Sequence, residues 1–143
     1  MDAELHLHLP NHPVTLNADS TLLSIALHNL IDNALRHGQR SVNEGNAAVC
    51  VTLLMQPGCL ELQVADLGAG IADGDKARVF ELFYTGFQQR TTAAPETSRL
   101  SRGLGLSIVQ NIARVHGGRV WVCDNRPQGA VLVISLPCLE SVT

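Results

Sequence analysis

The chain has 143 residues, of which 45% are hydrophobic and 16% are charged, and its formal net charge is -3 at pH 7. A chain of this length hides roughly two thirds of its unfolded surface, which suits one core better than two. Its ten Lys and Arg residues are scattered, so no basic face for nucleic acid is expected. No apolar run reaches the ~20 residues that span a bilayer, and residues 1–10 lack the layout of a signal peptide. We therefore expect one soluble domain over residues 1–143, without nucleic acid or direct membrane contact.

The four cysteines predict reduced thiols buried in the core. Cys50, Cys59, Cys123 and Cys138 form no C-x-x-C pair and stand mostly in apolar runs, where a thiol behaves as a small hydrophobic side chain. A zinc site is the alternative, although no histidine stands at ligand spacing from a cysteine. Reduced thiols indicate a cytoplasmic compartment.

The first half of the chain predicts a strand, a long helix and a hairpin. Three leucines alternate with polar residues over residues 4–9, which is typical of a half-buried strand. Apolar residues then recur at helical spacing from Asp19, a plausible N-cap, until Gly38. Residues 49–55 and 60–66 predict two strands of a hairpin, because Pro and Gly between them suit a tight turn.

The second half predicts a loop, a second helix and two more strands. After a short amphipathic piece at residues 76–83, residues 84–102 lose apolar periodicity and predict a mobile loop. A helix is expected from about residue 104 to His116, before strands at 119–123 and 130–136. Paired strands with helices between the pairs favour a two-layer α/β sandwich, with a mixed, mostly antiparallel sheet and helices on one face. A doubly wound parallel sheet fits less well.

Polar residues mark one border of the first predicted helix. Asn29 and Asn33 stand four residues apart, and Arg36 and His37 continue the same edge. Amide oxygens are suited to complete the coordination of Mg²⁺ beside water and phosphate oxygens. Taken alone, this border is more typical of the solvated edge of an amphipathic helix.

A carboxylate followed by glycines comes directly after a predicted strand, in the segment DLGAGI that begins at Asp66. Such a carboxylate can accept a hydrogen bond from an exocyclic amine like that of adenine, and the glycines let a flat ligand approach the backbone. The alternative is a glycine-rich turn with a capping Asp.

Glycines also stand where the second helix is expected to begin, in the segment RGLGLSIV that starts at Arg102. The unpaired N–H groups and the positive dipole of a helix N-terminus favour phosphate. The segment is neither a Walker A loop nor a dinucleotide fingerprint. A helix that merely starts with glycines is the alternative.

Taken in order, LHNLIDNALRH, DLGAGI, VFELFYTG and RGLGLSIVQNIARVHGG resemble the N, first glycine, F and second glycine boxes of bacterial two-component sensor histidine kinases. The resemblance is to their catalytic and ATP-binding domain, of the GHKL superfamily. It implies the Bergerat-type α/β sandwich and an ATP lid over about residues 84–102. Phe80, Phe83 and Tyr84 match the F box, expected to anchor the lid; an aromatic core cluster is the alternative.

The resemblance also implies a site for ATP and Mg²⁺. Asn29, Asn33 and Arg36 become the catalytic residues, with Asn33 as the Mg²⁺ ligand and Asn29 supporting it. Arg36 replaces the family's phosphate-contacting lysine, and Asp66 reads the adenine amine. The nucleotide-binding set is Asn29, Asn33, Arg36, His37, Asp66, Gly68, Gly70, Ile71, Tyr84, Arg99, Arg102, Gly103, Leu104, Gly105 and Leu106.

The implied activity is transfer of the γ-phosphoryl group of ATP to a histidine. Related ATPases carry a glutamate where this chain has Asn29, so no carboxylate is expected to activate water there. None of the six histidines precedes an acidic residue directly, as the acceptor does in the family. We therefore expect the dimerisation and phosphoacceptor helices to be absent from the chain, and the isolated domain not to phosphorylate itself.

The implied partners are the chain's own dimerisation helices and, indirectly, a response regulator. The implied location is the cytoplasmic side of a bacterial inner-membrane sensor. An anti-sigma-factor-type serine kinase and a nucleotide-binding adaptor without catalysis remain the alternatives.

Overall fold

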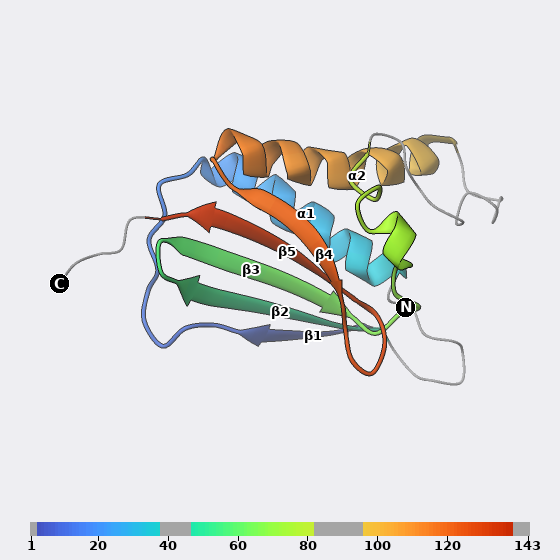
Figure 1. Ribbon diagram of the computed structural model, residues 1–143, viewed down its shortest axis with the longest axis horizontal. Helices are drawn as coiled ribbons and strands as arrows, with labels where there is room; N and C mark the ends of the chain where they lie inside the picture. Colours follow the sequence, from blue (N-terminus) through green and yellow to red (C-terminus); the bar gives the residue numbers. More distant parts are fainter. Residues whose placement is uncertain (1–2, 38–46, 82–95, 139–143) are drawn as a thin grey trace.

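A computed structural model describes residues 3–37, 47–81 and 96–138, and its fold is a five-stranded sheet in the order β1-β2-β3-β5-β4 (Figure 1). β1 and β2 are parallel, whereas the other three neighbouring pairs are antiparallel. The predicted two-layer sandwich with a mixed, mostly antiparallel sheet is confirmed. The strands are β1 (Ala3–His8), β2 (Ala47–Gln56), β3 (Cys59–Asp66), β4 (Arg119–Asp124) and β5 (Ala130–Pro137).

The helix α1 (Ser20–His37) begins where the sequence predicts. The backbone N–H of Leu22 donates to Asp19 Oδ1 at 3.0 Å, so Asp19 is the N-cap that satisfies an otherwise unpaired helix donor. Ala26, Leu30 and Ala34 form the buried face and are at most 2% exposed. This face sets α1 against β2 and β3.

The helix α2 (Glu96–Val115) begins earlier than the sequence predicts. The loop expected over residues 84–102 is therefore wrong for residues 96–102, while residues 84–95 lie outside the described part. A helix needs no apolar face in its first turns when its later turns are packed, and an acidic residue suits the first turn. The end of α2 is as predicted, because Gly117 has φ +76 and the Gly118 N–H donates to Ala113 O at 2.7 Å.

The hairpin of β2 and β3 is confirmed, with Gly58 at φ +77 in the turn. The segment after β3 contains a short 3-10 helix, η2 (Asp73–Asp75), followed by turns up to Phe80. Val79 and Phe80 are buried in the core, so the core interpretation holds for Phe80. Phe83 and Tyr84 lie outside the described residues.

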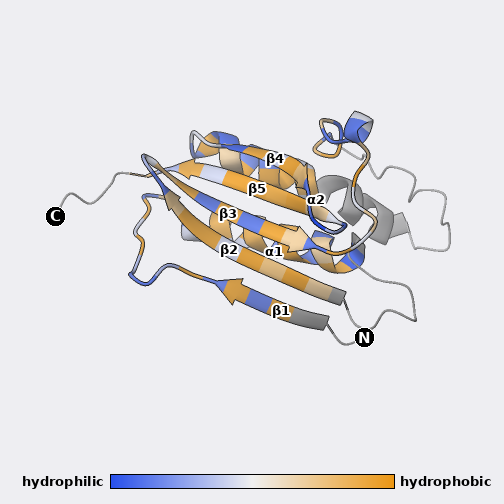
Figure 2. Ribbon diagram, turned by 60° about the horizontal axis from the view of Figure 1, so that its bottom comes forward, coloured by the Kyte–Doolittle hydropathy of each residue, from blue (hydrophilic) through white to orange (hydrophobic). Residues whose placement is uncertain are grey.

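One hydrophobic core lies between the helices and the sheet. α2 contacts β4 and β5, beside the contacts of α1 with β2 and β3, and the central strands carry mainly hydrophobic residues (Figure 2). The side chains of this core include Leu30, Val49, Val51, Val64, Val109, Ile112, Leu132 and Ile134.

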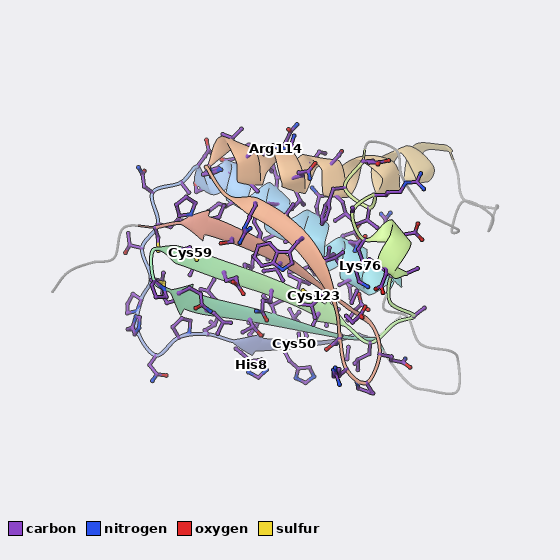
Figure 3. The ribbon with its side chains drawn as sticks, viewed as in Figure 1. His8, Cys50, Cys59, Lys76, Arg114 and Cys123 are labelled. Carbon is purple, nitrogen blue, oxygen red and sulfur yellow. The ribbon has the colours of Figure 1, made fainter. Side chains whose placement is uncertain are left out.

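The opposite face of the sheet carries three of the four thiols (Figure 3). Side chains alternate between the two faces of a strand, so Cys50 and Cys123 point away from the core that buries Val49 and Val122. The cysteines are free thiols, as predicted, but the prediction that they are buried is wrong. Cys123 is exposed and the other three are half-buried, because the described helices cover only one face.

The strand β1 is more exposed than the sequence predicts. Leu5 and Leu7 are 53% and 58% exposed, so the expected half-burial of this strand is wrong. β1 is an edge strand, and α1 lies over β2 and β3 instead. Among the described helices, none is both long and apolar enough to cross a membrane.

Candidate functional site

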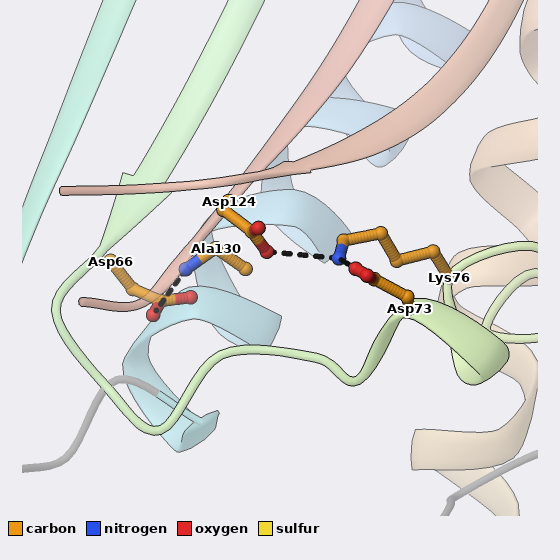
Figure 4. Close-up of polar contacts among 5 residues, drawn as sticks. All are labelled: Asp66, Asp73, Lys76, Asp124 and Ala130. Atoms are coloured by element: carbon orange, nitrogen blue, oxygen red, sulfur yellow. Dashed lines mark hydrogen bonds and ion pairs between the residues drawn. The ribbon is translucent and has the colours of Figure 1, made fainter.

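Asp66, the last residue of β3, has a carboxylate that is buried without being fully hydrogen-bonded. The residue is 4% exposed, and its Oδ1 accepts the N–H of Gly68 at 2.9 Å. The same oxygen accepts the N–H of Ala130 at 3.3 Å (Figure 4). Burial raises the pKa of Asp66, and the two backbone hydrogen bonds oppose that rise. Within the described residues no hydrogen bond reaches Oδ2, so this oxygen can accept a hydrogen bond from a ligand.

The loop after Asp66 runs against the connection between β4 and β5. Gly70 has φ +80, and a Cβ at this position would stand 3.1 Å from the carbonyl oxygen of Gly129. Ile71 packs against the core from the same loop. The glycine therefore permits both the left-handed backbone and the close contact.

A lysine fastens the following turn to β4. Lys76 Nζ pairs with Asp73 in η2 and lies 2.9 Å from Asp124 Oδ1 (Figure 4). Hydrogen bonds to Asp73 and Asp124 raise the pKa of Lys76, and the same contact lowers the pKa of Asp73. The segment that starts at Asp66 is thus tied to the sheet at both ends.

Asn29, on the polar border of α1, lies against Gly105 of α2. Asn29 and Asn33 are half-buried, and a Cβ on Gly105 would stand 3.5 Å from Asn29 Oδ1. Arg36 NH2 lies 3.1 Å from Asp32 Oδ2 on the same helix. The amide of Asn29 therefore lies beside Gly105, where α2 carries no side chain.

The family described as histidine kinase-, DNA gyrase B-, and HSP90-like ATPase has a model that matches residues 18–140. The chain belongs to this ATPase family. The sensor-like histidine kinase SenX3 of Mycobacterium tuberculosis is 33% identical over 96% of the chain, and the match covers 31% of SenX3. The sensor histidine kinase WalK of Bacillus subtilis is 29% identical over 93% of the chain, and the match covers 20% of WalK. The chain thus spans about a third or less of these curated relatives.

Solved structures of this ATPase family share the fold. The mycobacterial sensor histidine kinase MprB is 30% identical, with a TM-score of 0.73 over 95% of this chain and 82% of MprB. Full-length ShkA in complex with AMPPNP is 27% identical, with a TM-score of 0.75 over 99% of this chain and 27% of ShkA. The resemblance to histidine kinase catalytic domains is confirmed.

The structure assembles only part of the site that the resemblance implies. Asp66, Gly68, Gly70 and Ile71 lie together in one loop, and Asn29 lies beside Gly105. The side chain of Leu106 is buried in the core. The side chains of His37, Arg99, Arg102 and Leu104, and all of Tyr84, lie outside the described part.

The expected helix N-terminus at the second glycine box is wrong. Gly103 and Gly105 lie inside α2 (Glu96–Val115), not at its first residue. Interior N–H groups of a helix are paired with carbonyls, so in this conformation they do not offer the donors of a phosphate site.

Sequence reasoning missed the contribution of residues 125–129, between β4 and β5. Asn125 Nδ2 donates to the carbonyl oxygen of Asp66 at 2.7 Å, and Gln128 Nε2 donates to that of Leu67 at 2.7 Å. Asn, Pro and Gly in a short connection do indicate a turn. They give no sign that the turn holds a residue far earlier in the chain.

Proposed function

We propose that this chain binds Mg-ATP and donates the γ-phosphoryl group to a histidine on a separate dimerisation segment, in two-component signal transduction. The main support for this proposal is the buried Asp66. Its Oδ1 accepts two backbone N–H groups, and within the described residues its Oδ2 has no hydrogen bond and can accept one from a ligand. The exocyclic amine of adenine is a donor of the matching kind. The AMPPNP complex of ShkA, a structural neighbour, supports the assignment to an adenine nucleotide.

The proposed metal ligands are Asn33 and Asn29. Both amides are half-buried on the polar border of α1, and that of Asn29 lies against Gly105 of α2. Neutral amide oxygens suit a hard cation that keeps water and phosphate oxygens as its other ligands. Mg²⁺, when bound, supplies neutralisation of phosphate charge. Arg36 would add a cation at the same border by exchanging Asp32 for phosphate, since their pair is partly exposed.

Transfer to a protein histidine is favoured over hydrolysis at this site. Asn29 occupies the place where hydrolysing relatives have a glutamate, and an amide cannot accept a proton from water. A histidine nucleophile needs no such base. Positioning and charge neutralisation then supply most of the catalysis.

A reconstitution experiment tests the whole proposal. The chain is mixed with radiolabelled Mg-ATP, alone and together with a dimeric helical hairpin that bears the acceptor histidine of a related sensor kinase. We expect saturable ATP binding by calorimetry, no label on the chain alone, and label on the hairpin when both are present. In the full protein, its own dimerisation and phosphoacceptor helices and, indirectly, a response regulator would be the partners, on the cytoplasmic side of an inner-membrane sensor.

Three outcomes would contradict the proposal. Label on the chain itself would contradict the separation of acceptor and donor. Saturable binding with label on a serine of an added protein would favour the anti-sigma-type kinase. Absence of any saturable signal with Mg-ATP would favour the adaptor.

A further inference from the structure

The connection between β4 and β5, residues 125–129, replaces sheet pairing at Asp66. The pairing of β3 with β5 ends at Ala65 and Val131. Beyond that point Asn125 Nδ2 donates to Asp66 O at 2.7 Å, and Ala130 N–H donates to Asp66 Oδ1 at 3.3 Å. The connection therefore holds the main chain of Asp66, and Ala130, the first residue of β5 directly after it, holds the carboxylate.

The backbone of the connection lies directly against the backbone of Asp66 at Gly129. Gly129 is buried and has φ +105, and a Cβ there would stand 2.0 Å from Asp66 O and 3.0 Å from Asp66 Oδ1. No side chain fits at such a distance. A displacement of the connection is therefore transmitted directly to Asp66.

The amide of Asn125 is oriented by partners at both ends. Its Oδ1 accepts the Arg126 N–H at 2.9 Å, while its Nδ2 donates to Asp66 O. The Asn125 N–H donates to Gly129 O at 3.0 Å and closes the connection on itself. Gln128, whose side chain is exposed, adds the hydrogen bond to Leu67 O.

We propose that Asn125 and Gln128 are positioning residues that hold Asp66 where it discriminates between purines. This inference rests on the proposed function of Asp66 as the acceptor for the adenine amine. A guanine base presents a carbonyl oxygen at the corresponding position, so a well-placed carboxylate both attracts ATP and repels GTP. A displaced carboxylate attracts ATP less and repels GTP less, because hydrogen bonds weaken steeply with distance and angle.

The test uses Asn125→Ala and Gln128→Ala in the 143-residue chain, with Gln56→Ala as the matched control. Gln56 is exposed and pairs with Cys59, at the other end of β3 from Asp66. Affinities for Mg-ATP and Mg-GTP are measured by calorimetry. We expect each variant to weaken ATP binding by roughly five- to tenfold without weakening GTP binding, and the control to bind as the parent does.

A second measurement needs no nucleotide. Hydrogen exchange of the Gly68 and Ala130 amides, which both donate to Asp66 Oδ1, is followed by NMR in the free proteins. We expect faster exchange of these two amides in both variants, and unchanged exchange in the hairpin turn around Gly58.

The outcomes separate the two proposals. Equal losses of ATP and GTP affinity, or unchanged affinity for both, would reduce these side chains to a structural role and overturn the positioning inference. Unchanged exchange of both amides would overturn it as well. If the parent chain bound neither nucleotide, the proposed function would fail together with the purine preference, whatever the exchange rates.

Discussion

At the scale of single residues, Asp66 is the one buried charged side chain among those described. Within the described residues, its carboxylate is stabilised by backbone N–H groups, with no cation paired to it. Burial disfavours the charged form more than these hydrogen bonds favour it, which is why the pKa of Asp66 is raised. A buried charged group of this kind lowers the stability of the fold, a cost that is typical of ligand-binding sites.

Asp66→Asn tests this cost and the adenine assignment together. We expect ATP binding to weaken by about 1.5–3 kcal/mol, because the charge-assisted acceptor is lost. The folded pKa of Asp66 lies above its unfolded value of 3.8, so the native state holds the proton more tightly. The parent should therefore lose stability relative to the variant as pH rises through the folded pKa.

Urea unfolding across about pH 3 to about pH 8 measures this difference. If the parent protein gained stability relative to Asp66→Asn with rising pH, the predicted direction of the pH dependence would be wrong. An unchanged preference for ATP over GTP in the variant would contradict the adenine role.

Gly105→Ala separates stability from binding. Replacing a glycine inside α2 should stabilise the helix by about 0.5–1 kcal/mol, since the new Cβ would stand 3.5 Å from Asn29 Oδ1, an ordinary contact distance. The methyl group would nevertheless occupy the space beside the proposed metal ligand. We expect ATP binding to weaken by ~1 kcal/mol or more.

The matched control for this substitution is Gly74→Ala, where nothing lies within 4 Å of the new Cβ. Calorimetry and thermal unfolding of both variants decide the outcome. If Gly105→Ala bound Mg-ATP as tightly as the control, the space beside Asn29 would have no part in the site.

At the scale of elements, a hydrogen bond links the C-terminal end of α2 to the N-terminal end of α1, which packs beside it. His116, directly after α2, accepts the Asp19 N–H on Nε2 at 3.0 Å and donates from Nδ1 to Ile112 O at 2.8 Å. Asp19 is in turn the N-cap of α1. The end of one helix therefore supports the start of the other.

Asp19→Ala and His116→Ala should each lower the free energy of unfolding by about 1 kcal/mol, through the lost cap and the lost acceptor respectively. The N–H that His116 accepts belongs to the backbone of residue 19 and remains in Asp19→Ala, so the two substitutions remove different hydrogen bonds. Both bonds fix the start of α1, and an uncapped start no longer holds that N–H in place, so the double variant should lose less than the sum. Urea unfolding of the four proteins measures the coupling, with His8→Ala as a control on an exposed histidine. Strict additivity would show that the two helix ends are independent.

The periodic elements could be predicted because their signals are local. The apolar spacing and Asp19 defined α1, and Pro57 with Gly58 defined the hairpin turn. The start of α2 could not be predicted, because its first turns lack apolar periodicity and depend on the packed turns that follow. The exposure of β1 and of Cys123 depends on which strands the helices cover, and that is a property of the assembled sheet.

At the scale of the whole molecule, the motifs identified the family but not the full construction of the site. Asp66 and its glycines were visible in one short segment. The contribution of Asn125 and Gln128 to the site could not be predicted from the sequence, since their hydrogen-bond partners stand 59 and 61 residues earlier in the chain. The glycines of the second glycine box predict the start of a helix, whereas α2 runs through them.

The long separation between Asp66 and its supports has a consequence for synthesis on the ribosome. Asp66 leaves the ribosome well before Asn125 and Ala130, which both donate hydrogen bonds to it. Such non-local contacts form late, because a long stretch of chain must first be ordered. A nascent chain that has completed α1 and the hairpin of β2 and β3 therefore lacks the finished surroundings of Asp66, the proposed acceptor for adenine. If ATP binds as proposed, it can act as a folding ligand only after translation of the hairpin of β4 and β5.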